Sequence, residues 1–283
     1  MSQQGTTQSY VDAPTRTIAA SDARFAYREL GPQTGLPLVL LTHLGANLDG
    51  WDPLVIDGLA QDRHVIAVDY RGVGGSTGHV RDSIGEMADD VLALIQALGH
   101  DRVDMFGLAI GGMVAQAVAE RAPRLIDRLV LAAAGPAGGP GLDAAPRVTI
   151  TTGLRAGLTL NDPKTLLFFT STAAGKRAAR AYLARLKERT TGRDKPVTAG
   201  TYRAQLTALS RWGQQTPAEL SSAVGEVFIV HGDSDRLVPP ANAAELARVF
   251  PGATVTVYPD SGHGAVFQYH REFVDAARDF LRR

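Results

Sequence analysis

The stretch MFGLAIGGMVAQ, from Met105 to Gln116, predicts a sharp turn between a strand and a helix. In a G-x-S-x-G elbow the nucleophile stands at the tip of that turn, and small neighbours let the strand and the helix approach each other. Here the motif is G-x-A-x-G, and the residue at the tip is Ala109, whose methyl group cannot attack a substrate. Taken alone, the motif is better explained by ordinary packing glycines, because the serine is missing.

Short, continuous apolar runs recur on both sides of this elbow, as is typical of strands that are buried on both faces of a sheet. They cover 36–45, 64–72, 103–112, 126–135, 226–235 and 253–264. Helical patterns lie between or after them, over 83–99, 112–123, 240–250 and 271–281, and a hairpin is expected over 16–30. This alternation predicts an α/β fold with a mostly parallel central sheet flanked by helices.

The alternation breaks over residues 136–217, where a turn-rich segment is followed by helical patterns at 175–190 and 201–212. We interpret this insertion as a helical cap, or lid, because ligand sites in such sheets lie at the carboxyl ends of the strands, where the insertion leaves and returns. A surface excursion without a role in binding is the alternative. The predicted domains are a flexible N-terminal tail (1–14), an α/β core (15–135 and 218–283) and the cap (136–217).

The composition narrows the class of protein. The 283 residues include 29 lysines and arginines against 29 aspartates and glutamates, so the net charge gives no electrostatic footprint for nucleic acid or a membrane surface. The chain has no cysteine, which excludes disulfides, thiolate metal sites and a cysteine nucleophile. No apolar run approaches the length of a membrane span, and the polar first residues lack a signal-peptide pattern. We therefore expect a cytoplasmic protein that binds neither nucleic acid nor a membrane.

Two further motifs change the interpretation of the elbow. The segment HGDSDRLVPP places Asp235 after a predicted strand, and PDSGHG places His263 after the next one. The chain order of elbow, acid and histidine is the order of an α/β-hydrolase triad. The chemistry needs this grouping, because a hydroxyl becomes a good nucleophile only when an imidazole takes its proton and a carboxylate orients that imidazole.

With these motifs the chain resembles an α/β-hydrolase-fold protein with a helical cap, from about residue 17 onward. DYRGVGGSTG (69–78) resembles the D-x-R-G-x-G-x-S segment of that family, and LLTHLGANLDGW (40–51) resembles its oxyanion loop before a tryptophan. The resemblance implies catalytic positions at Ala109, Asp235 and His263, and it implies oxyanion donors at the backbone N–H groups of Leu44 and Ile110. If the loop is aligned with a one-residue gap, the first donor is Gly45 instead; we favour Leu44.

The resemblance implies a serine-type hydrolase, because Ile110 followed by two glycines is closer to serine elbows than to aspartate elbows. We therefore predict an esterase- or lactonase-like enzyme for carboxylic esters, lactones or related carbonyl substrates, which is inactive or nearly so with Ala109. Two histories fit the alanine: an engineered Ser→Ala replacement that traps substrate, or a natural protein that binds without turnover. The retained Asp235 and His263 favour the first.

Alternatives remain at this point. One is a naturally noncatalytic ligand-binding protein, and the other is an epoxide hydrolase or lyase that uses His263 and Asp235, with tyrosines of the cap as further candidates. No cofactor is expected, and no metal site, because the histidines are scattered. The expected partner is a small apolar ester or lactone, and the sequence predicts no oligomeric state. The candidate substrate-binding residues are His43, Gly45, Phe168 and Tyr182.

Overall fold

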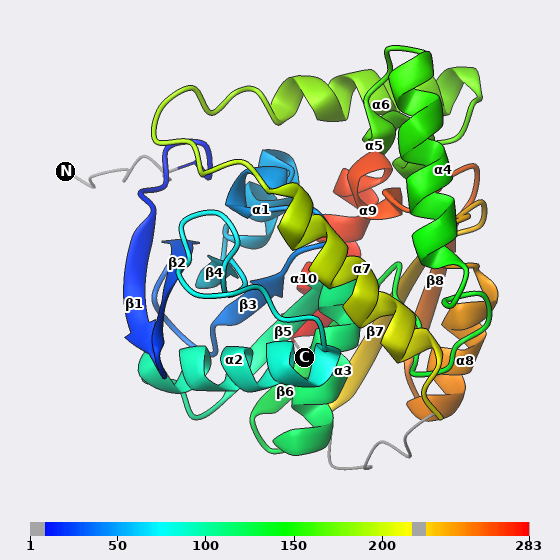
Figure 1. The fold of residues 1–283 in the computed structure, drawn as a ribbon. Coiled ribbons are helices and arrows are strands. Elements are labelled where there is room, and N and C mark those ends of the chain that lie inside the picture. The colour runs from blue at the N-terminus through cyan, green and yellow to red at the C-terminus, as the bar shows by residue number, and fades with distance from the viewer. Residues whose placement is uncertain (1–8, 217–224, 283) are drawn as a thin grey trace.

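The structure is a computed structural model that describes residues 9–216 and 225–282 (Figure 1). Its centre is one eight-stranded sheet with the strand order β1-β2-β4-β3-β5-β6-β7-β8. Strands β1 and β2 form the predicted hairpin, and β2 pairs antiparallel with β4, whereas all the other pairs are parallel. The predicted mostly parallel sheet is confirmed. The strands are β1 (Arg16–Ala20), β2 (Ala23–Leu30), β3 (Leu38–Leu41), β4 (Val65–Val68), β5 (Val103–Leu108), β6 (Ile126–Ala132), β7 (Glu226–Gly232) and β8 (Thr254–Tyr258).

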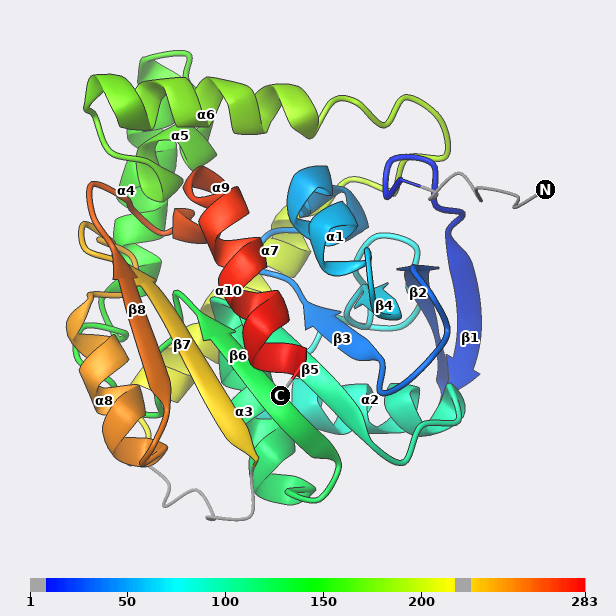
Figure 2. The same ribbon diagram turned by 180° about the vertical axis from the view of Figure 1, so that it is seen from behind.

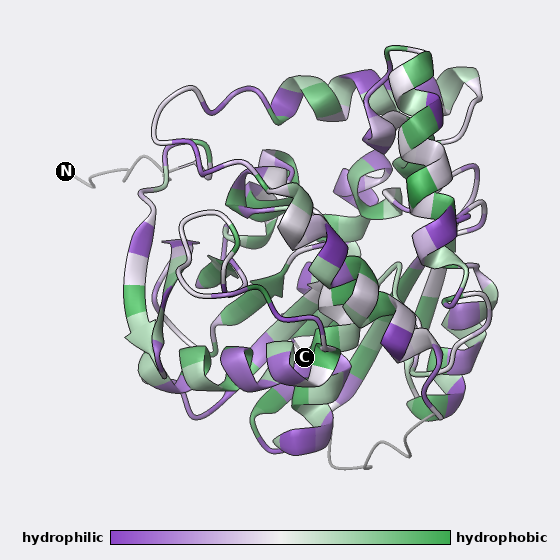
Figure 3. Cartoon of the chain, viewed as in Figure 1, coloured by the Kyte–Doolittle hydropathy of each residue, from purple (hydrophilic) through white to green (hydrophobic). Residues whose placement is uncertain are grey.

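The central strands are buried on both faces, which explains their continuous apolar sequences. In β3, Val39 and Leu41 belong to one hydrophobic cluster, while Leu38 and Leu40 belong to another. Successive side chains of a strand point to opposite faces, so the sheet separates two cores. In Figure 3 the central strands are mostly hydrophobic, whereas the helices that cover them mix hydrophobic and hydrophilic residues.

Helices cover each face of the sheet (Figures 1 and 2). One core includes side chains of α2, α3 and α8, and the other includes side chains of α1, α9 and α10. The sequence patterns predicted four of these six helices but missed α1 and α9, which are short. The helices are α1 (Pro53–Leu59), α2 (Ile84–Ala97), α3 (Ile110–Arg121), α8 (Ala241–Val249), α9 (Ala265–Gln268) and α10 (His270–Arg282).

Between β6 and β7 the chain forms the helices α4 (Ala145–Leu158), α5 (Pro163–Phe168), α6 (Ala173–Arg185) and α7 (Ala199–Gly213). Helices α6 and α7 fall on the two helical patterns of the predicted cap, and both begin with a threonine whose hydroxyl caps a backbone N–H. Arg185 fixes α6 to the core, because its guanidinium bonds both oxygens of the fully buried Asp52, at 2.6 and 2.8 Å. Such two-point contacts are directional and strong.

The N-terminal prediction needs a correction. Residues 1–8 of the expected flexible tail lie outside the described residues, but residues 9–14 are packed against the core. The ring of Tyr10 is 2% exposed, and its hydroxyl donates a hydrogen bond to the carbonyl of Leu48. Arg189, from the segment after α6, donates to the carbonyls of Val11 and Ala13, both at 2.9 Å. The prediction of a tail is wrong for these residues because an aromatic anchor and a buried arginine hold them.

Candidate active site

The elbow at Ala109 has the strained geometry that the sequence predicts for a nucleophile position. Ala109 lies between β5 and α3 with φ 55° and ψ −117°, a conformation that side-chain-bearing residues rarely adopt. Such a residue costs about 1–3 kcal/mol. The flanking glycines are required by space, since a Cβ at Gly107 would lie 2.4 Å from the carbonyl oxygen of Gly111, and one at Gly111 would lie 2.1 Å from that of Leu41. The chain therefore keeps the elbow although the tip carries only a methyl group.

Asp235 and His263 meet at the carboxyl edge of the sheet. Asp235 follows β7, His263 follows β8, and the distance from His263 Nδ1 to Asp235 Oδ2 is 2.8 Å. Both side chains are buried. The other carboxylate oxygen of Asp235 accepts the backbone N–H groups of Leu237 and Val238, at 2.8 and 3.0 Å. The carboxylate is thus held in place while it orients the imidazole, and Nε2 of His263 is left for chemistry.

His231, which the sequence analysis missed, supports the acid from behind. It lies in β7, is fully buried, and its Nε2 is 2.9 Å from the carbonyl oxygen of Val238 and 3.6 Å from Asp235 Oδ2. Burial lowers the pKa of His231, so the ring is neutral at ordinary pH. In the sequence, His231 appears as a single histidine within an apolar strand. A histidine with a purely structural role would occupy the same kind of position.

The loop after β3 distinguishes the two candidate oxyanion donors. The N–H of Gly45 already donates to Oε1 of Gln205 on α7, at 2.8 Å. Among the described residues no hydrogen bond is found for the N–H of Leu44. Ile110 is the first residue of α3, so the helix itself does not bond its N–H. Leu44, unlike Gly45, therefore keeps a backbone N–H without a partner among the described residues, as the predicted oxyanion donor requires.

His43 holds this loop in shape. Its Nδ1 is 3.0 Å from the carbonyl oxygen of Leu44, which assigns the proton to Nδ1 and leaves Nε2 as a bare acceptor. Burial lowers the pKa of His43 to about 3, so the ring is neutral. Gly45 has φ 71°, and a Cβ there would lie 2.3 Å from the ring of Tyr202, so no larger residue fits this turn.

The end of α5 fixes the position of His263. The backbone N–H groups of His263 and Gly264 donate to the carbonyls of Leu167 and Phe168, at 3.2 and 3.0 Å. The ring of Phe168 also packs 5.6 Å from that of His263 and 5.0 Å from that of His43. Leu167 and Phe168 line a cavity and also belong to the hydrophobic core that contains α1 and α10.

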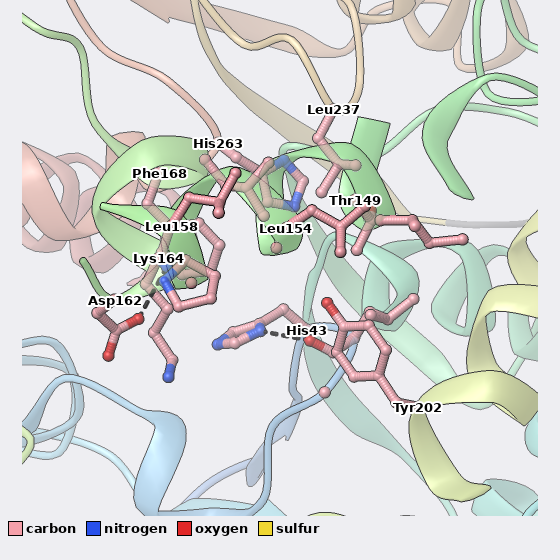
Figure 4. A pocket seen from close by; sticks show the side chains of 17 residues that line it. His43, Thr149, Leu154, Leu158, Asp162, Lys164, Phe168, Tyr202, Leu237 and His263 are labelled. Carbon is pink, nitrogen blue, oxygen red and sulfur yellow. Dashed lines mark hydrogen bonds between the residues drawn. The ribbon is translucent and has the colours of Figure 1, made fainter. Parts of the chain in front are cut away.

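A cavity of about 830 Å³ opens onto these groups (Figure 4). Its size is typical of a small-molecule site. The loops after β3, β7 and β8 contribute to its wall together with α4, α5 and α7, which places it at the carboxyl edge of the sheet. The lining residues are His43, Leu44, Gly45, Thr149, Ile150, Gly153, Leu154, Gly157, Leu158, Asp162, Pro163, Lys164, Leu167, Phe168, Tyr202, Leu237 and His263.

Of the four predicted substrate-binding residues, His43, Gly45 and Phe168 line the cavity, and Tyr182 does not. Tyr182 is fully buried, stacks on Phe267 at 4.5 Å, and its hydroxyl donates to the carbonyl of Gly50 at 3.1 Å. The prediction for Tyr182 is wrong because its side of α6 faces the core. Of the two cap tyrosines, Tyr182 and Tyr202, only Tyr202 lines the cavity and remains a candidate for the epoxide-hydrolase alternative.

Within residues 9–216 and 225–282, no cluster of three or more metal-ligating side chains is found. In the same part of the chain, no helix is both long enough and apolar enough to cross a bilayer.

Comparisons with known proteins agree with this fold. The family described as alpha/beta hydrolase fold matches residues 37–268. A solved alpha/beta hydrolase fold protein from Chitinophaga pinensis is 35% identical, with a TM-score of 0.91, and the match covers 97% of this chain and 99% of that one. A solved N-acyl homoserine lactone degrading enzyme is 27% identical, with a TM-score of 0.72, over 94% of this chain and 100% of that one.

A curated relative is the dihydrolipoyllysine-residue acetyltransferase component of the acetoin cleaving system of Pseudomonas putida. It is 29% identical over 260 residues, which are 90% of this chain but 66% of that protein. The chain thus spans about two thirds of the length of this relative.

Proposed function

Because the chain belongs to the α/β-hydrolase fold family, we propose that its cavity takes a carboxylic ester or lactone, and that serine in place of Ala109 makes it a hydrolase of that substrate. As it stands, the chain binds the substrate and barely turns it over. The observation that carries this proposal is the 2.8 Å pair of His263 and Asp235 at the same sheet edge as the strained elbow. An elbow, an acid and a histidine in this chain order are the parts of a serine hydrolase.

With serine at position 109, the chemistry follows from the groups in place. Nε2 of His263 takes the hydroxyl proton while the serine oxygen attacks the carbonyl carbon, and the N–H groups of Leu44 and Ile110 bind the oxyanion. The intermediate then collapses, the leaving alcohol takes the proton from His263, and an acyl-enzyme remains. Water attacks that ester with His263 as the base, which releases the acid and restores the hydroxyl. Asp235 stabilises the imidazolium throughout, and the reaction needs no cofactor.

With alanine, the binding groups survive because they are backbone N–H groups and cavity walls, which the side chain of residue 109 does not supply. This is the arrangement that a replaced serine would leave behind. The similarity to a lactone-degrading enzyme supports a lactone or ester as the substrate class. The largely apolar lining supports an apolar one.

We further propose that residues 136–217 act as a cap over the site. Helices α4, α5 and α7 of this segment contribute more than half of the residues that line the cavity, together with the Asp162 turn before α5. Gln205 of α7 also bonds the oxyanion loop at Gly45. The segment therefore shapes both the substrate space and the loop that would bind the oxyanion.

The test is hydrolysis of activated aryl esters and of lactones by the Ala109→Ser variant beside the unchanged chain. We expect kcat to rise by on the order of 10⁴- to 10⁶-fold, because loss of the nucleophile costs about that much in a serine hydrolase. The matched control is Ala109→Ser with His263→Ala, which keeps the serine and removes its base. The proposal is overturned if the serine variant folds like the parent and hydrolyses none of these substrates above the control.

A naturally noncatalytic ligand-binding role is the second candidate, and the elbow itself favours it, since the strain at Ala109 persists without a nucleophile. In that case the chain binds an uncleavable carbonyl ligand in the cavity, and the Ala109→Ser variant shows no burst and no turnover. A lyase-type reaction with His263 and Asp235 alone would instead require turnover by the unchanged chain in the same assays.

A further inference from the structure

One wall of the cavity is made by α4, and its side chains there are apolar and exposed. Ile150, Leu154 and Leu158 are 55%, 67% and 88% exposed. They stand four residues apart on one helix face, so they form a continuous row. Large apolar side chains that are exposed together beside a pocket mark a surface that a ligand or partner covers. Thr149, Gly153 and Gly157 line the cavity from the neighbouring row.

The two glycines of α4 widen the space beside this row. Glycine inside a helix lowers helix stability relative to alanine, so its presence at Gly153 and Gly157 calls for a reason. No packing contact supplies one, because a Cβ at either position would meet no atom within 4 Å. The space that these side chains would fill is part of the cavity. The row of apolar side chains and the row of glycines together form a trough about 12 Å long, from Ile150 to Leu158.

The same cavity also has a polar end. His43 is 3% exposed, lines the cavity, and its Nε2 is buried without a hydrogen-bond partner among the described residues. A buried acceptor without a partner is costly unless something donates to it. The cavity thus has polar groups near His263 and His43, and an apolar trough along α4.

We propose that the trough along α4 binds the unbranched apolar chain of the substrate, so that the site selects medium- to long-chain esters or lactones over short ones. This inference rests on the proposed function for the identity of the reacting group. A chain that lies in the trough covers Leu154 and Leu158, which otherwise face water. Each added methylene strengthens binding by about two- to fourfold until the trough is full, with fourfold as the value for complete burial.

The experiment uses uncleavable probes on the chain as it stands. The probes are straight-chain methyl ketones from hexanone to dodecanone, which carry a carbonyl and an alkyl chain, and binding is measured by isothermal titration calorimetry. We expect the dissociation constant to fall at each step up to decanone, in total by at least about 16-fold. Equal affinity for all the ketones, or a preference for hexanone, overturns the inference.

Variants of α4 locate the effect. Leu154→Ser with Leu158→Ser should weaken decanone binding at least about tenfold and leave hexanone within about twofold, because two apolar contacts of the far chain are lost. The matched control is Leu160→Ser, a leucine that is 96% exposed just beyond α4 and outside the cavity lining. If Leu160→Ser weakens decanone as much as the double variant does, the trough does not bind the chain.

A variant that fills part of the trough tests the role of the two glycines. Gly157→Leu adds a good helix former in open space, so the variant should fold at least as well as the parent, which circular dichroism can check. Binding of dodecanone should then weaken by at least about tenfold while hexanone is unaffected. Unchanged dodecanone binding in this folded variant overturns the inference.

These outcomes are distinguishable from failure of the proposed function. Chain-length-dependent ketone binding with an inactive Ala109→Ser variant keeps the trough and rejects the hydrolase. Hydrolysis by the Ala109→Ser variant that is indifferent to chain length, together with ketone binding that does not vary with chain length, keeps the hydrolase and rejects the trough.

Discussion

The carboxyl groups of Asp69 and Asp194 meet beside Gly74, although one follows β4 and the other lies between α6 and α7. A Cβ at Gly74 would be 2.3 Å from Asp69 Oδ2 and 2.1 Å from Asp194 Oδ2, so the two oxygens are neighbours. Asp69 is fully buried, and Asp194 Oδ2 is buried without a donor. Burial, and then the hydrogen bond and charge of Asp194, raise the pKa of Asp69 well above its usual range. One proton shared by the two carboxyls satisfies both oxygens.

This pair predicts how stability depends on pH. Since the folded pKa of Asp69 is raised, its stabilising contribution is complete below the unfolded value near 4 and is lost as the pH rises through the folded pKa. A folded pKa that lies one pH unit above the unfolded pKa corresponds to about 1.4 kcal/mol of unfolding free energy. Asp194→Asn supplies a permanent N–H donor in place of the shared proton. We expect this variant to gain stability over the parent above neutral pH, as measured by urea denaturation from pH 5 to pH 9.

The other charges around the pair set the control for this experiment. The N–H of Asp194 donates to Asp49 Oδ2 at 2.9 Å, and Asp49 itself faces Arg28, Arg189 and Arg193. The matched control is Asp162→Asn, which makes the same change from carboxylate to amide at a helix cap outside this cluster. If the difference between Asp194→Asn and the parent does not grow with pH, or if Asp162→Asn shows the same growth, the two carboxyls do not share a proton.

A second prediction concerns the acid of the proposed triad. In the Ala109→Ser background, Asp235→Asn should lower kcat by about 10⁴-fold, because an amide oxygen and an amide nitrogen cannot orient the imidazole as a carboxylate does. KM should change little, since Asp235 is buried behind His263 and is not among the cavity-lining residues. Steady-state kinetics on a phenyl ester measure both values. Retention of more than a tenth of kcat in a folded variant would show that Asp235 does not act with the histidine.

A third prediction separates His43 from the catalytic histidine. In the Ala109→Ser background, His43→Ala removes the donor that holds the Leu44 carbonyl, so kcat should fall by about tenfold, which is the worth of one hydrogen bond. His43→Asn keeps an N–H near the place of Nδ1 and should recover much of that loss. Because the pKa of His43 is about 3, the shape of the pH–rate profile between pH 5 and pH 9 should be the same in all three proteins. A profile that loses a step in His43→Ala would mean that His43 titrates during catalysis.

The sequence predicted the sheet and the candidate positions at its carboxyl edge because both depend on local signals. Buried strands read as apolar runs, and the elbow shows as a short local motif, in which Gly107 is forced by the carbonyl of Gly111. Gly111 itself is forced by Leu41 of β3, a contact that the motif does not reveal. Helix α1 has seven residues, too few to show a helical period. The bond between Gly45 and Gln205 joins residues that are 160 positions apart, and no local pattern encodes it. Tyr182 was misplaced for a similar reason, since α6 shows its helical period but not which side faces the core.

The last prediction compares the same glycine-to-alanine substitution at two positions that differ in their surroundings. Gly107→Ala places a Cβ 2.4 Å from the Gly111 carbonyl and 2.5 Å from the Cα of Gly112, so strand and helix must separate at the elbow. We expect it to cost more than about 3 kcal/mol of unfolding free energy, in the range of severe core overpacking. Gly153→Ala meets nothing within 4 Å inside α4 and should instead add about 0.5–1 kcal/mol. Urea denaturation of both variants tests the contrast, and a Gly107→Ala protein as stable as Gly153→Ala would show that the elbow is not closely packed.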